Sequence, residues 1–176
     1  MPDPAGLELI ANELRDRHPG SVVETLHYRG IATLLVEPGK LLPILGWLRD
    51  DPTQGYRFLA SIHASDYLPQ EPRFGVHYEL LNMKRVERIH VKALLADPGE
   101  DGLPEIDSCV ELFPTADFQE REAYDMFGIV FRGHPDLRRI LMPEEYEGWP
   151  QRRDFPMGGE PVLFTYNEHS LPRWYE

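Results

Sequence analysis

Apolar residues recur along the first half of the chain with two different periods. In segments 6–17 and 40–49 they return every three or four residues, which is the period of an amphipathic helix. Alternating apolar positions and runs of β-branched and aromatic residues predict five strands, at 21–28, 31–36, 56–63, 74–81 and 88–95. Short turns join these elements in the order helix, two strands, helix, three strands. This order predicts an α+β fold with a mostly antiparallel five-stranded sheet and two helices on one face.

Acidic residues without any basic one mark the segment 97–107. Prolines and glycines separate its five acids, which predicts an acidic surface loop between a sheet domain at 1–96 and a second part at 108–176. After the loop, Ser108 and Glu111 have the spacing of a capping box, in which each side chain satisfies a backbone N–H at a helix start. The sequence therefore predicts a short helix directly after the loop.

A second short helix is predicted over 118–127. Asp117 suits the N-cap position and Glu120 follows three residues later, which is again the spacing of a capping box. Gly128 suits the left-handed backbone position that commonly follows a helix end. Both ends of this helix are thus indicated by the residues that flank it.

The charged side chains of this second helix predict ion pairs. Arg121 and Asp125 have the i,i+4 spacing that joins opposite charges, whereas Glu122 and Asp125 repel each other unless a cation lies between them. A guanidinium group binds both oxygens of a carboxylate at once, so arginines are suited to that place. The chain supplies five of them beyond the helix: Arg132, Arg138, Arg139, Arg152 and Arg153.

Frequent prolines exclude long helices and central strands from the C-terminal part of the chain. The sequence has 17 prolines, and several of them follow the second helix: Pro135, Pro143, Pro150, Pro156, Pro161 and Pro172. We therefore expect short helices followed by an extended irregular arm that is rich in Trp, Tyr, Phe and Arg. Such side chains are buried best against another protein subunit, which predicts a docking role for the arm.

Three acids that lie close together, Glu120, Glu122 and Asp125, raise the alternative of acid–base catalysis. That chemistry requires two carboxyl groups in different environments that face one cleft, and structural pairing with arginine is the competing interpretation. His134 also has two interpretations: a proton relay or metal ligand, or a side chain that fixes the bend at Pro135. No second His or Cys lies at local ligand spacing, which favours the structural role.

The single cysteine, Cys109, excludes both a disulfide within the chain and a cluster that needs about four thiolates. Its acidic neighbours raise a thiol pKa, so we expect a buried structural cysteine rather than a nucleophile. Neither a phosphate-binding loop nor a dinucleotide fingerprint is present. The other histidines are scattered, mostly singly on predicted strands, and indicate no cluster: His18, His27, His63, His77, His90 and His169.

The composition of this chain of 176 residues restricts the classes of partner that it can bind directly. A net charge of −12 argues against nucleic acid and against anionic lipid surfaces as direct partners. No run approaches the roughly 20 apolar residues that a membrane-spanning helix needs. The first residues lack the basic and apolar regions of a signal peptide, so an intracellular, reducing compartment is expected.

The segment 120–141 carries a resemblance to a known family. It reads EREAYDMFGIVFRGHPDLRRIL, and GWPQRRDFP follows at 148–156. Together these segments resemble the signature of the respiratory complex I 30-kDa subunit family, whose bacterial members belong to the NADH-quinone oxidoreductase. Weaker similarity extends upstream, and Gln151 and Arg153 depart from the family's usual residues without altering the charge pattern.

The resemblance implies a structural and assembly subunit in the peripheral arm of a proton-pumping NADH:quinone oxidoreductase. It implies no catalytic, cofactor-binding or metal residue in this chain; FMN, iron–sulfur clusters and quinone belong to partner subunits. The implied partners are the large quinone-site subunit and the subunit with the terminal iron–sulfur cluster, without nucleic acid or direct membrane insertion. The implied location is peripheral, on the cytoplasmic face of the bacterial plasma membrane. The alternative is the equivalent subunit of a related membrane-bound nickel–iron hydrogenase.

The signature also predicts which residues form the subunit interface or support it. They are Glu120, Arg121, Glu122, Tyr124, Asp125, Phe127, Gly128, His134, Pro135, Arg138, Arg139, Arg152, Arg153 and Asp154.

Overall fold

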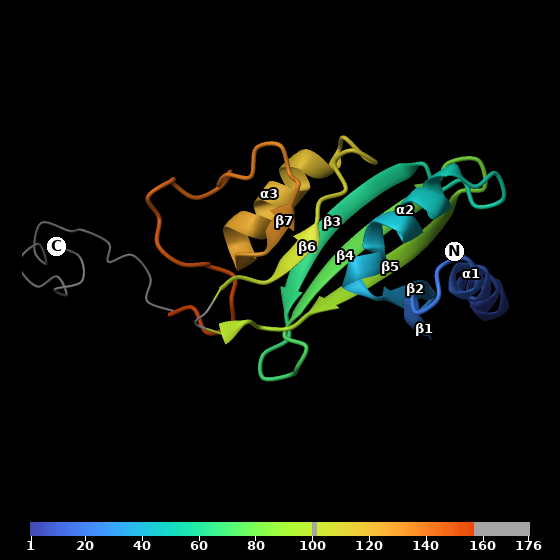
Figure 1. Cartoon of the computed structure of the whole chain (residues 1–176), viewed down its shortest axis with the longest axis horizontal. Coiled ribbons are helices and arrows are strands. Elements are labelled where there is room, and N and C mark those ends of the chain that lie inside the picture. The colour runs from blue at the N-terminus through green and yellow to red at the C-terminus, as the bar shows by residue number, and fades with distance from the viewer. Residues whose placement is uncertain (100–101, 157–176) are drawn as a thin grey trace, which may run out of the picture.

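The computed structural model describes residues 1–99 and 102–156, and its main element is one five-stranded sheet (Figure 1). The strand order is β1-β2-β5-β4-β3, and only the β2–β5 pair is parallel. The strands are β1 (Val22–Tyr28), β2 (Ile31–Val36), β3 (Phe58–Asp66), β4 (Phe74–Asn82) and β5 (Glu87–Leu95). The predicted α+β class and mostly antiparallel sheet are confirmed.

One face of the sheet is apolar because alternate residues of each strand share a side. A row across four strands shows the pattern: Leu34, Val91, Tyr78 and Ile62 are paired in register and buried. Helices α1 (Pro4–Arg17) and α2 (Leu41–Asp50), the latter preceded by the 3₁₀ turn η1 (Pro38–Lys40), add their own apolar stripes to this core. The two amphipathic helices predicted from periodicity are thus confirmed (Figure 1).

A third helix, α3 (Ala116–Phe127), lies along β3 at the edge of the sheet. The amide oxygen of Gln119 accepts a hydrogen bond from the backbone N–H of Ile62, which has no neighbouring strand on that side. The helix therefore covers an edge that could otherwise pair with another chain. Gly128 ends it at φ 71°, as predicted, but the N-cap is Thr115, so the capping box at Asp117 is wrong.

Two short strands that the sequence did not indicate form a separate parallel pair. β6 (Glu105–Asp107) ends the predicted acidic loop and pairs with β7 (Val130–Arg132), which follows α3. Ile106 and Phe131 point from these strands into the main core, so the second part of the chain shares the core of the sheet. The helix predicted after the loop is wrong: residues 108–113 form turns.

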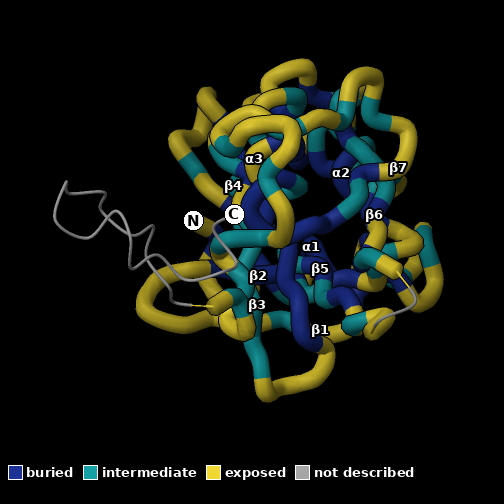
Figure 2. The backbone as a smooth tube through the Cα atoms, turned by 90° about the vertical axis from the view of Figure 1, so that its left-hand side faces the viewer, coloured by how far each residue is buried: buried dark blue, intermediate teal, exposed yellow. Residues whose placement is uncertain are grey.

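Residues 133–156 form no regular element and fold back beside α3 (Figure 1), and most of them are exposed. Figure 2 shows exposed residues concentrated in the outer loops. The last 20 residues of the predicted arm lie outside the described residues, as do Glu100 and Asp101 of the acidic loop. Within the described ranges, no helix combines the length and apolar character needed to cross a membrane. We call residues 133–156 the arm below.

Candidate functional site

Asp125 on α3 is the first of two polar centres that hold the arm. Its carboxylate is fully buried and accepts the backbone N–H groups of Ile140, Leu141 and Met142 at 3.0, 2.7 and 2.8 Å. Arg139 donates to the other oxygen at 2.7 Å. Burial alone would raise the pKa of Asp125, but these donors lower it below its usual value. The carboxylate therefore determines the path of four consecutive arm residues.

Arg121 does not pair with Asp125, so the predicted i,i+4 ion pair is wrong. Its guanidinium is buried and donates at 3.2 Å to the backbone carbonyls of Arg138 and Arg139. It also lies 5.7 Å from the centre of the exposed Phe118 ring. The two charged residues of α3 thus hold the same arm segment, one through its N–H groups and the other through its carbonyls.

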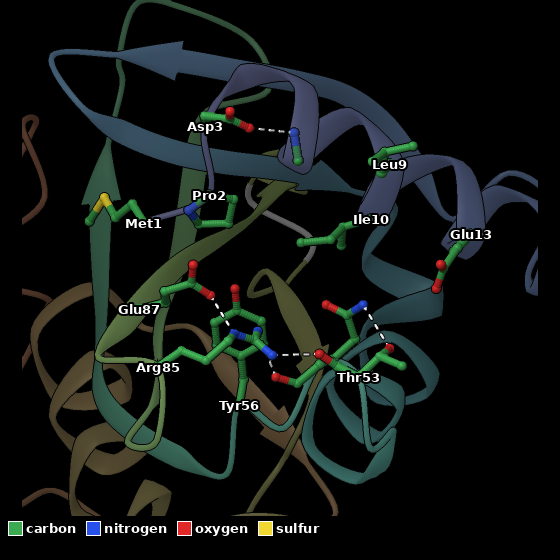
Figure 3. A pocket seen from close by; sticks show the side chains of 12 residues that line it. Met1, Pro2, Asp3, Leu9, Ile10, Glu13, Thr53, Tyr56, Arg85 and Glu87 are labelled. Atoms are coloured by element: carbon green, nitrogen blue, oxygen red, sulfur yellow. Dashed lines mark hydrogen bonds and ion pairs between the residues drawn. The ribbon is translucent and has the colours of Figure 1, made fainter.

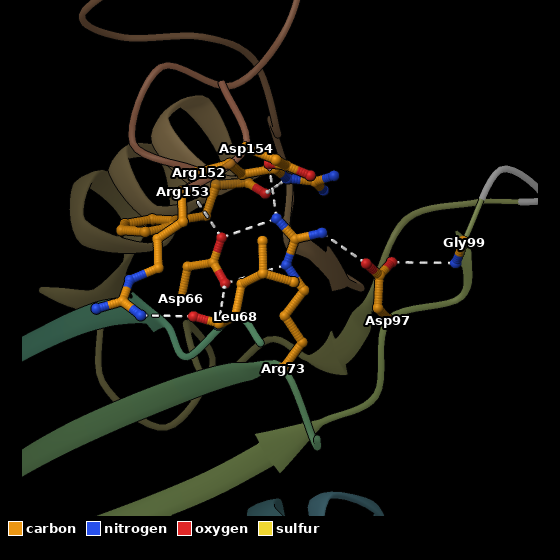
Figure 4. A network of polar contacts seen from close by, with 9 residues as sticks. Asp66, Leu68, Arg73, Asp97, Gly99, Arg152, Arg153 and Asp154 are labelled. Carbon is orange, nitrogen blue, oxygen red and sulfur yellow. Dashed lines mark hydrogen bonds and ion pairs between the residues drawn. The ribbon is translucent and has the colours of Figure 1, made fainter. Parts of the chain in front are cut away.

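Arg73 is the second polar centre, at the start of β4 (Figure 4). Its side chain is 5% exposed and contacts three carboxylates: Asp66 through two hydrogen bonds of 2.8 and 3.0 Å, and Asp97 and Asp154 at 2.7 Å each. Three separate segments therefore meet at one guanidinium. Burial would raise the pKa of Asp66, but the hydrogen bonds from Arg73 and from two backbone N–H groups lower it to about 2.

The arm residue Arg153 strengthens the same junction. Its backbone N–H donates to Asp66 at 2.8 Å, and its guanidinium donates to the backbone carbonyl of Leu68. Asp97, predicted as part of a flexible acidic loop, is instead tied to the sheet by Arg73. The end of the arm is thus joined to both loops that leave this end of the sheet.

Arginines and aromatic rings alternate between the two polar centres. Arg152 lies 4.9 Å from the ring of Phe74 and 5.8 Å from that of Trp149, while Arg139 lies 4.6 Å from Trp149 and 5.8 Å from Tyr146. Each cation faces two rings, an arrangement that is attractive for Arg in particular. Burial lowers the pKa of Arg152, and its Nε donates to a backbone carbonyl at the end of α3 at 2.7 Å.

Glu120 stabilises the turn that precedes α3. It is fully buried and accepts hydrogen bonds from the Ser108 hydroxyl at 2.6 Å and from the Cys109 backbone N–H at 2.8 Å. Ser108 is thereby engaged with α3 rather than with Glu111, which explains why the predicted capping box does not form. Burial and the adjacent Glu120 raise the pKa of the Cys109 thiol, consistent with the predicted structural cysteine.

The three acids considered for catalysis do not face one cleft. Glu120 is turned toward the preceding turn and Asp125 toward the arm, whereas Glu122 is exposed. Glu122 lines a small cleft of about 210 Å³ between α3 and β3 together with Ser61 and His63. Since the two buried acids are saturated by hydrogen-bond donors, the geometry supports structural roles for them.

His134 fixes the bend at Pro135, as the structural interpretation predicts. Its Nδ1 accepts the backbone N–H of Asp136 at 3.0 Å, so Nε2 carries the proton and donates to the backbone carbonyl of Asp117 at 3.2 Å. The ring is fully buried. It joins the first turn of the arm to the first turn of α3.

A row of three histidines on the open face of the sheet was missed. His63, His77 and His90 stack across β3, β4 and β5 with ring centres 4.8 and 5.0 Å apart, so the prediction of scattered histidines is wrong. Hydrogen bonds of 2.9 to 3.0 Å run from Tyr67 through His77 and His90 to Thr33. Part of the signal was available, because each of the three lies on one of three consecutive predicted strands, but the sequence analysis gave no strand order.

Burial lowers the pKa of all three stacked histidines, which favours their neutral forms. Burial, followed by neighbouring positive groups, lowers the pKa of His77 to about 3 and that of His90 to about 4. Nowhere in the described part of the chain do three or more His, Cys, Asp or Glu residues gather in a way that could hold a metal ion.

The predicted interface residues divide into two groups. Most face inward and are bonded or packed within the chain: Glu120, Arg121, Tyr124, Asp125, Phe127, Gly128, His134, Arg139 and Arg152. Asp154 lies between the groups, because its side chain is 50% exposed but pairs with Arg73. The others face solvent: Glu122, Pro135, Arg138 and Arg153. Gly128 is needed for close packing, since a Cβ there would lie 2.6 Å from Trp149.

Comparison with known proteins identifies the family of this arrangement. The profile described as respiratory-chain NADH dehydrogenase, 30 Kd subunit, matches residues 34–161. An NADH-quinone oxidoreductase subunit from Roseiflexus castenholzii is 43% identical over 153 residues, covering 87% of this chain and 86% of the relative. The subunit of the same name from Herpetosiphon aurantiacus is 48% identical over 141 residues, covering 79% of each chain.

A solved structure has the same fold at lower sequence identity. One chain of the membrane-bound sulfane sulfur reductase, an archaeal respiratory membrane complex, matches with a TM-score of 0.67, 22% identity and 85% coverage of both chains. The extended sequence matches and the shared fold lead to one conclusion: the chain belongs to the family of the respiratory-chain NADH dehydrogenase 30 Kd subunit.

Proposed function

We propose that this chain is a subunit of the peripheral arm of a proton-pumping NADH:quinone oxidoreductase and holds no redox group of its own. Its family membership and the shared name of its relatives support this assignment. In the complex it supports the large subunit that shapes the quinone cavity and the subunit that carries the terminal iron–sulfur cluster. FMN, the clusters and quinone are bound by partners. The chain lies on the cytoplasmic side of the bacterial plasma membrane and is attached through those partners.

The observation that carries the proposal is an exposed face built from α3 and the arm. We call it the α3–arm face, and its residues are Phe118, Glu122, Arg138, Ile140 and Leu141. Phe118 and Leu141 are 63% and 61% exposed, and the Arg138 side chain is 59% exposed. Large exposed apolar side chains with charged residues around them are typical of a protein–protein interface, whose centre is apolar and whose rim is polar.

The base of this face is rigid before any partner binds. Asp125 holds the N–H groups of Ile140 and Leu141, and Arg121 holds the carbonyl of Arg138. A preformed surface loses less conformational entropy on association, which favours binding. The inward-facing residues of the signature therefore shape the docking surface, and its outward residues make the contacts.

Co-purification with the two proposed partner subunits tests the assignment. The variant Phe118→Asp/Leu141→Asp places two charges in the apolar centre of the α3–arm face. We expect its affinity for the partners to fall by about tenfold or more, since an interface centre loses more than about 1.4 kcal/mol on such a change. The matched control, Leu9→Asp/Val23→Asp, changes two equally exposed apolar residues of α1 and β1 and should bind normally.

Two results would contradict the proposal at different levels. A wild-type chain that never co-purifies with the other subunits would refute the assignment to the complex. A wild-type chain that binds, with a face variant that binds equally well, would refute only the placement of the interface. Thermal melting of each variant alone shows whether its fold is intact.

A further inference from the structure

The turn between β4 and β5 presents apolar and basic side chains at the end of the sheet away from the arm (Figure 1). We call this surface the β4–β5 tip. Its residues are Arg57, Phe58, Met83, Lys84, Val86 and Arg88, all of them exposed. Three of these are basic and none is acidic, and the adjoining Arg85 and Glu87 pair with each other, although the chain as a whole has 30 acidic and 18 basic residues. The tip is therefore a local reversal of the charge of the protein.

Val86 is held in an unfavourable backbone conformation at the outermost point of the tip. Its φ is +52°, a value that β-branched residues rarely adopt, and its side chain is 80% exposed. Neither burial nor hydrogen bonding by the side chain offsets the strain there, and glycine would adopt the same φ without it. Arg29 in the β1–β2 turn has a similar φ of +51°, so a positive φ alone does not mark a binding site; at Val86 the strained residue itself presents an apolar side chain to solvent.

The tip is preorganised by polar contacts beneath it. The Asn82 side chain accepts the backbone N–H groups of Lys84 and Arg85 at 2.9 and 3.0 Å and donates to the Gln54 carbonyl at 2.7 Å. Arg85, whose side chain is 39% exposed, bonds Glu87 at 2.6 Å and the backbone carbonyl of Thr53 (Figure 3). Arg85 is thus neutralised within the chain and acts as a brace for the turn.

The three basic residues at the surface of the tip are available to a partner. Within residues 1–99 and 102–156, Arg57, Lys84 and Arg88 form no ion pair with a carboxylate closer than 4.0 Å. Beside them, a recess of about 370 Å³ opens between the tip and the neighbouring loop, lined by Arg57 and Met83 among others. The surface therefore combines a projection, a hollow and positive side chains that form no direct ion pair within the described residues, although Arg57 and Arg88 lie near enough to Asp50 and Glu79 to attract those carboxyls.

We propose that the β4–β5 tip is a second docking surface, for a folded protein that offers an apolar recess rimmed by carboxylates. The charge of the tip calls for an acidic rim, and the projecting Met83 and Val86 call for an apolar floor. A rigid projection beside a hollow matches a shaped protein surface better than a planar bilayer, and the acidic remainder of the chain opposes anionic lipid. The inference rests on the proposed function in one respect: the partner that binds the tip is taken to be another subunit of the same complex.

The test measures the affinity of the full chain for the remaining subunits of the purified complex. Met83→Asp/Lys84→Glu should lower this affinity at least about tenfold, with unchanged melting of the chain alone. Tyr28→Asp/Arg29→Glu is the matched control, because it alters an exposed apolar residue and an exposed cation at the β1–β2 turn. A tip variant within twofold of wild type would overturn the inference, while the α3–arm variants judge the proposed function separately.

Two further measurements separate the alternatives. Val86→Gly should raise the melting temperature by relieving the strain and still weaken subunit binding; a lower melting temperature or unchanged binding would count against a binding role. Purified chain is also mixed with vesicles of phosphatidylcholine containing phosphatidylserine. No binding is the expected result. Binding that Met83→Asp/Lys84→Glu abolishes, with subunit affinity unchanged, would replace the protein partner by a membrane.

Discussion

The sheet with α1 and α2 and the region formed by α3 and the arm are stabilised by different interactions. In the sheet, apolar side chains such as Leu34, Tyr78 and Val91 are buried in rows across the strands. In the α3–arm region, backbone N–H groups and Arg139 converge on the buried carboxylate of Asp125, and three carboxylates converge on the guanidinium of Arg73. Apolar packing tolerates small changes of shape, whereas a buried charge is stable only while its partners remain. Single substitutions of these polar residues should therefore destabilise the α3–arm region more than the sheet.

Removal of Asp125 should have the largest effect. Asp125→Ala leaves three backbone N–H groups and Arg139 without their acceptor, which costs about 4 kcal/mol. Hydrogen exchange should show the amides of 140–142 losing protection while those of β4 and β5 keep theirs. Glu122→Ala, at an exposed position of the same helix, is the matched control and should change little. Equal loss of protection in β4 would show that the two regions unfold as one unit.

Substitution of Arg73 tests the junction between the regions. Arg73→Ala leaves Asp66 buried without its cation and removes the shared partner of Asp97 and Asp154. The free energy of unfolding, measured by urea denaturation, should therefore fall by about 3 kcal/mol. Arg73→Lys should restore only part of this, because an ammonium group cannot serve three carboxylates in the geometry of a guanidinium. Full rescue by lysine would mean that charge alone matters here.

Removal of Trp149 tests the alternation of cations and rings in the arm. Trp149→Ala takes away the ring between Arg139 and Arg152 and the edge-on contact with Tyr124. We expect a loss of about 2 kcal/mol, since the indole is only partly buried. Trp149→Phe should recover most of it in the same denaturation experiment. An unchanged midpoint for the alanine variant would show that the two polar centres alone hold the arm.

The difference between the regions also explains which parts of the structure were predictable. Periodicity identified the sheet and both covering helices because burial imposes a repeat on consecutive residues. Gly128 was predictable for a similar reason: its left-handed conformation is a local requirement. Local patterns predict these elements because a core position requires only an apolar residue at the right spacing, not one specific partner residue.

The contacts of the α3–arm region depend on residues far apart in the sequence. Arg121 and Asp125 satisfy a local pairing rule, yet Asp125 is occupied by residues 15 to 17 positions further along the chain. β6 and β7 have only three residues each and pair across α3, so neither shows a measurable period. Ser108 likewise bonds Glu120 instead of its local partner. In each case a distant donor or acceptor displaced the local one.

As the pH falls, the contribution of the histidine row to stability should be lost before that of the Asp66–Arg73 junction. His77 and His90 have folded pKa values of about 3 and 4, below the usual 6.5, so their contribution to stability is present above pH 6.5 and is lost as pH falls from there. The pKa of Asp66 is lowered from 3.8 to about 2, so its contribution is lost only below about pH 4. Lys92 and His63, which face the pair, add to the cost of protonation.

Urea denaturation between pH 6 and 5 measures this difference directly. Wild type should lose stability with falling pH, and His77→Gln should reduce the slope by about 1.4 kcal/mol per pH unit, the equivalent of one proton. His27→Gln, at an exposed strand position, is the control and should leave the slope unchanged. A wild-type curve that is flat in this range would contradict the neutral histidine row.

Arg138→Ala should have the smallest effect on the stability of the isolated chain. It should also distinguish most clearly between a loss of stability and a loss of binding. The Arg138 side chain is exposed, and within residues 1–99 and 102–156 its one ion pair is with Asp136, which is itself 62% exposed. Its loss should therefore change the free energy of unfolding by less than about 0.5 kcal/mol. Its neighbour Arg139 contacts the buried Asp125, and Arg139→Ala should destabilise the arm severalfold more. In the assembled complex, Arg138→Ala should weaken binding to partner subunits because a direct contact is lost, while the stability of the chain stays unchanged. Melting temperature and subunit affinity are measured for Arg138→Ala and Arg139→Ala. If affinity falls only in proportion to stability in the two variants, Arg138 makes no direct contact with a partner.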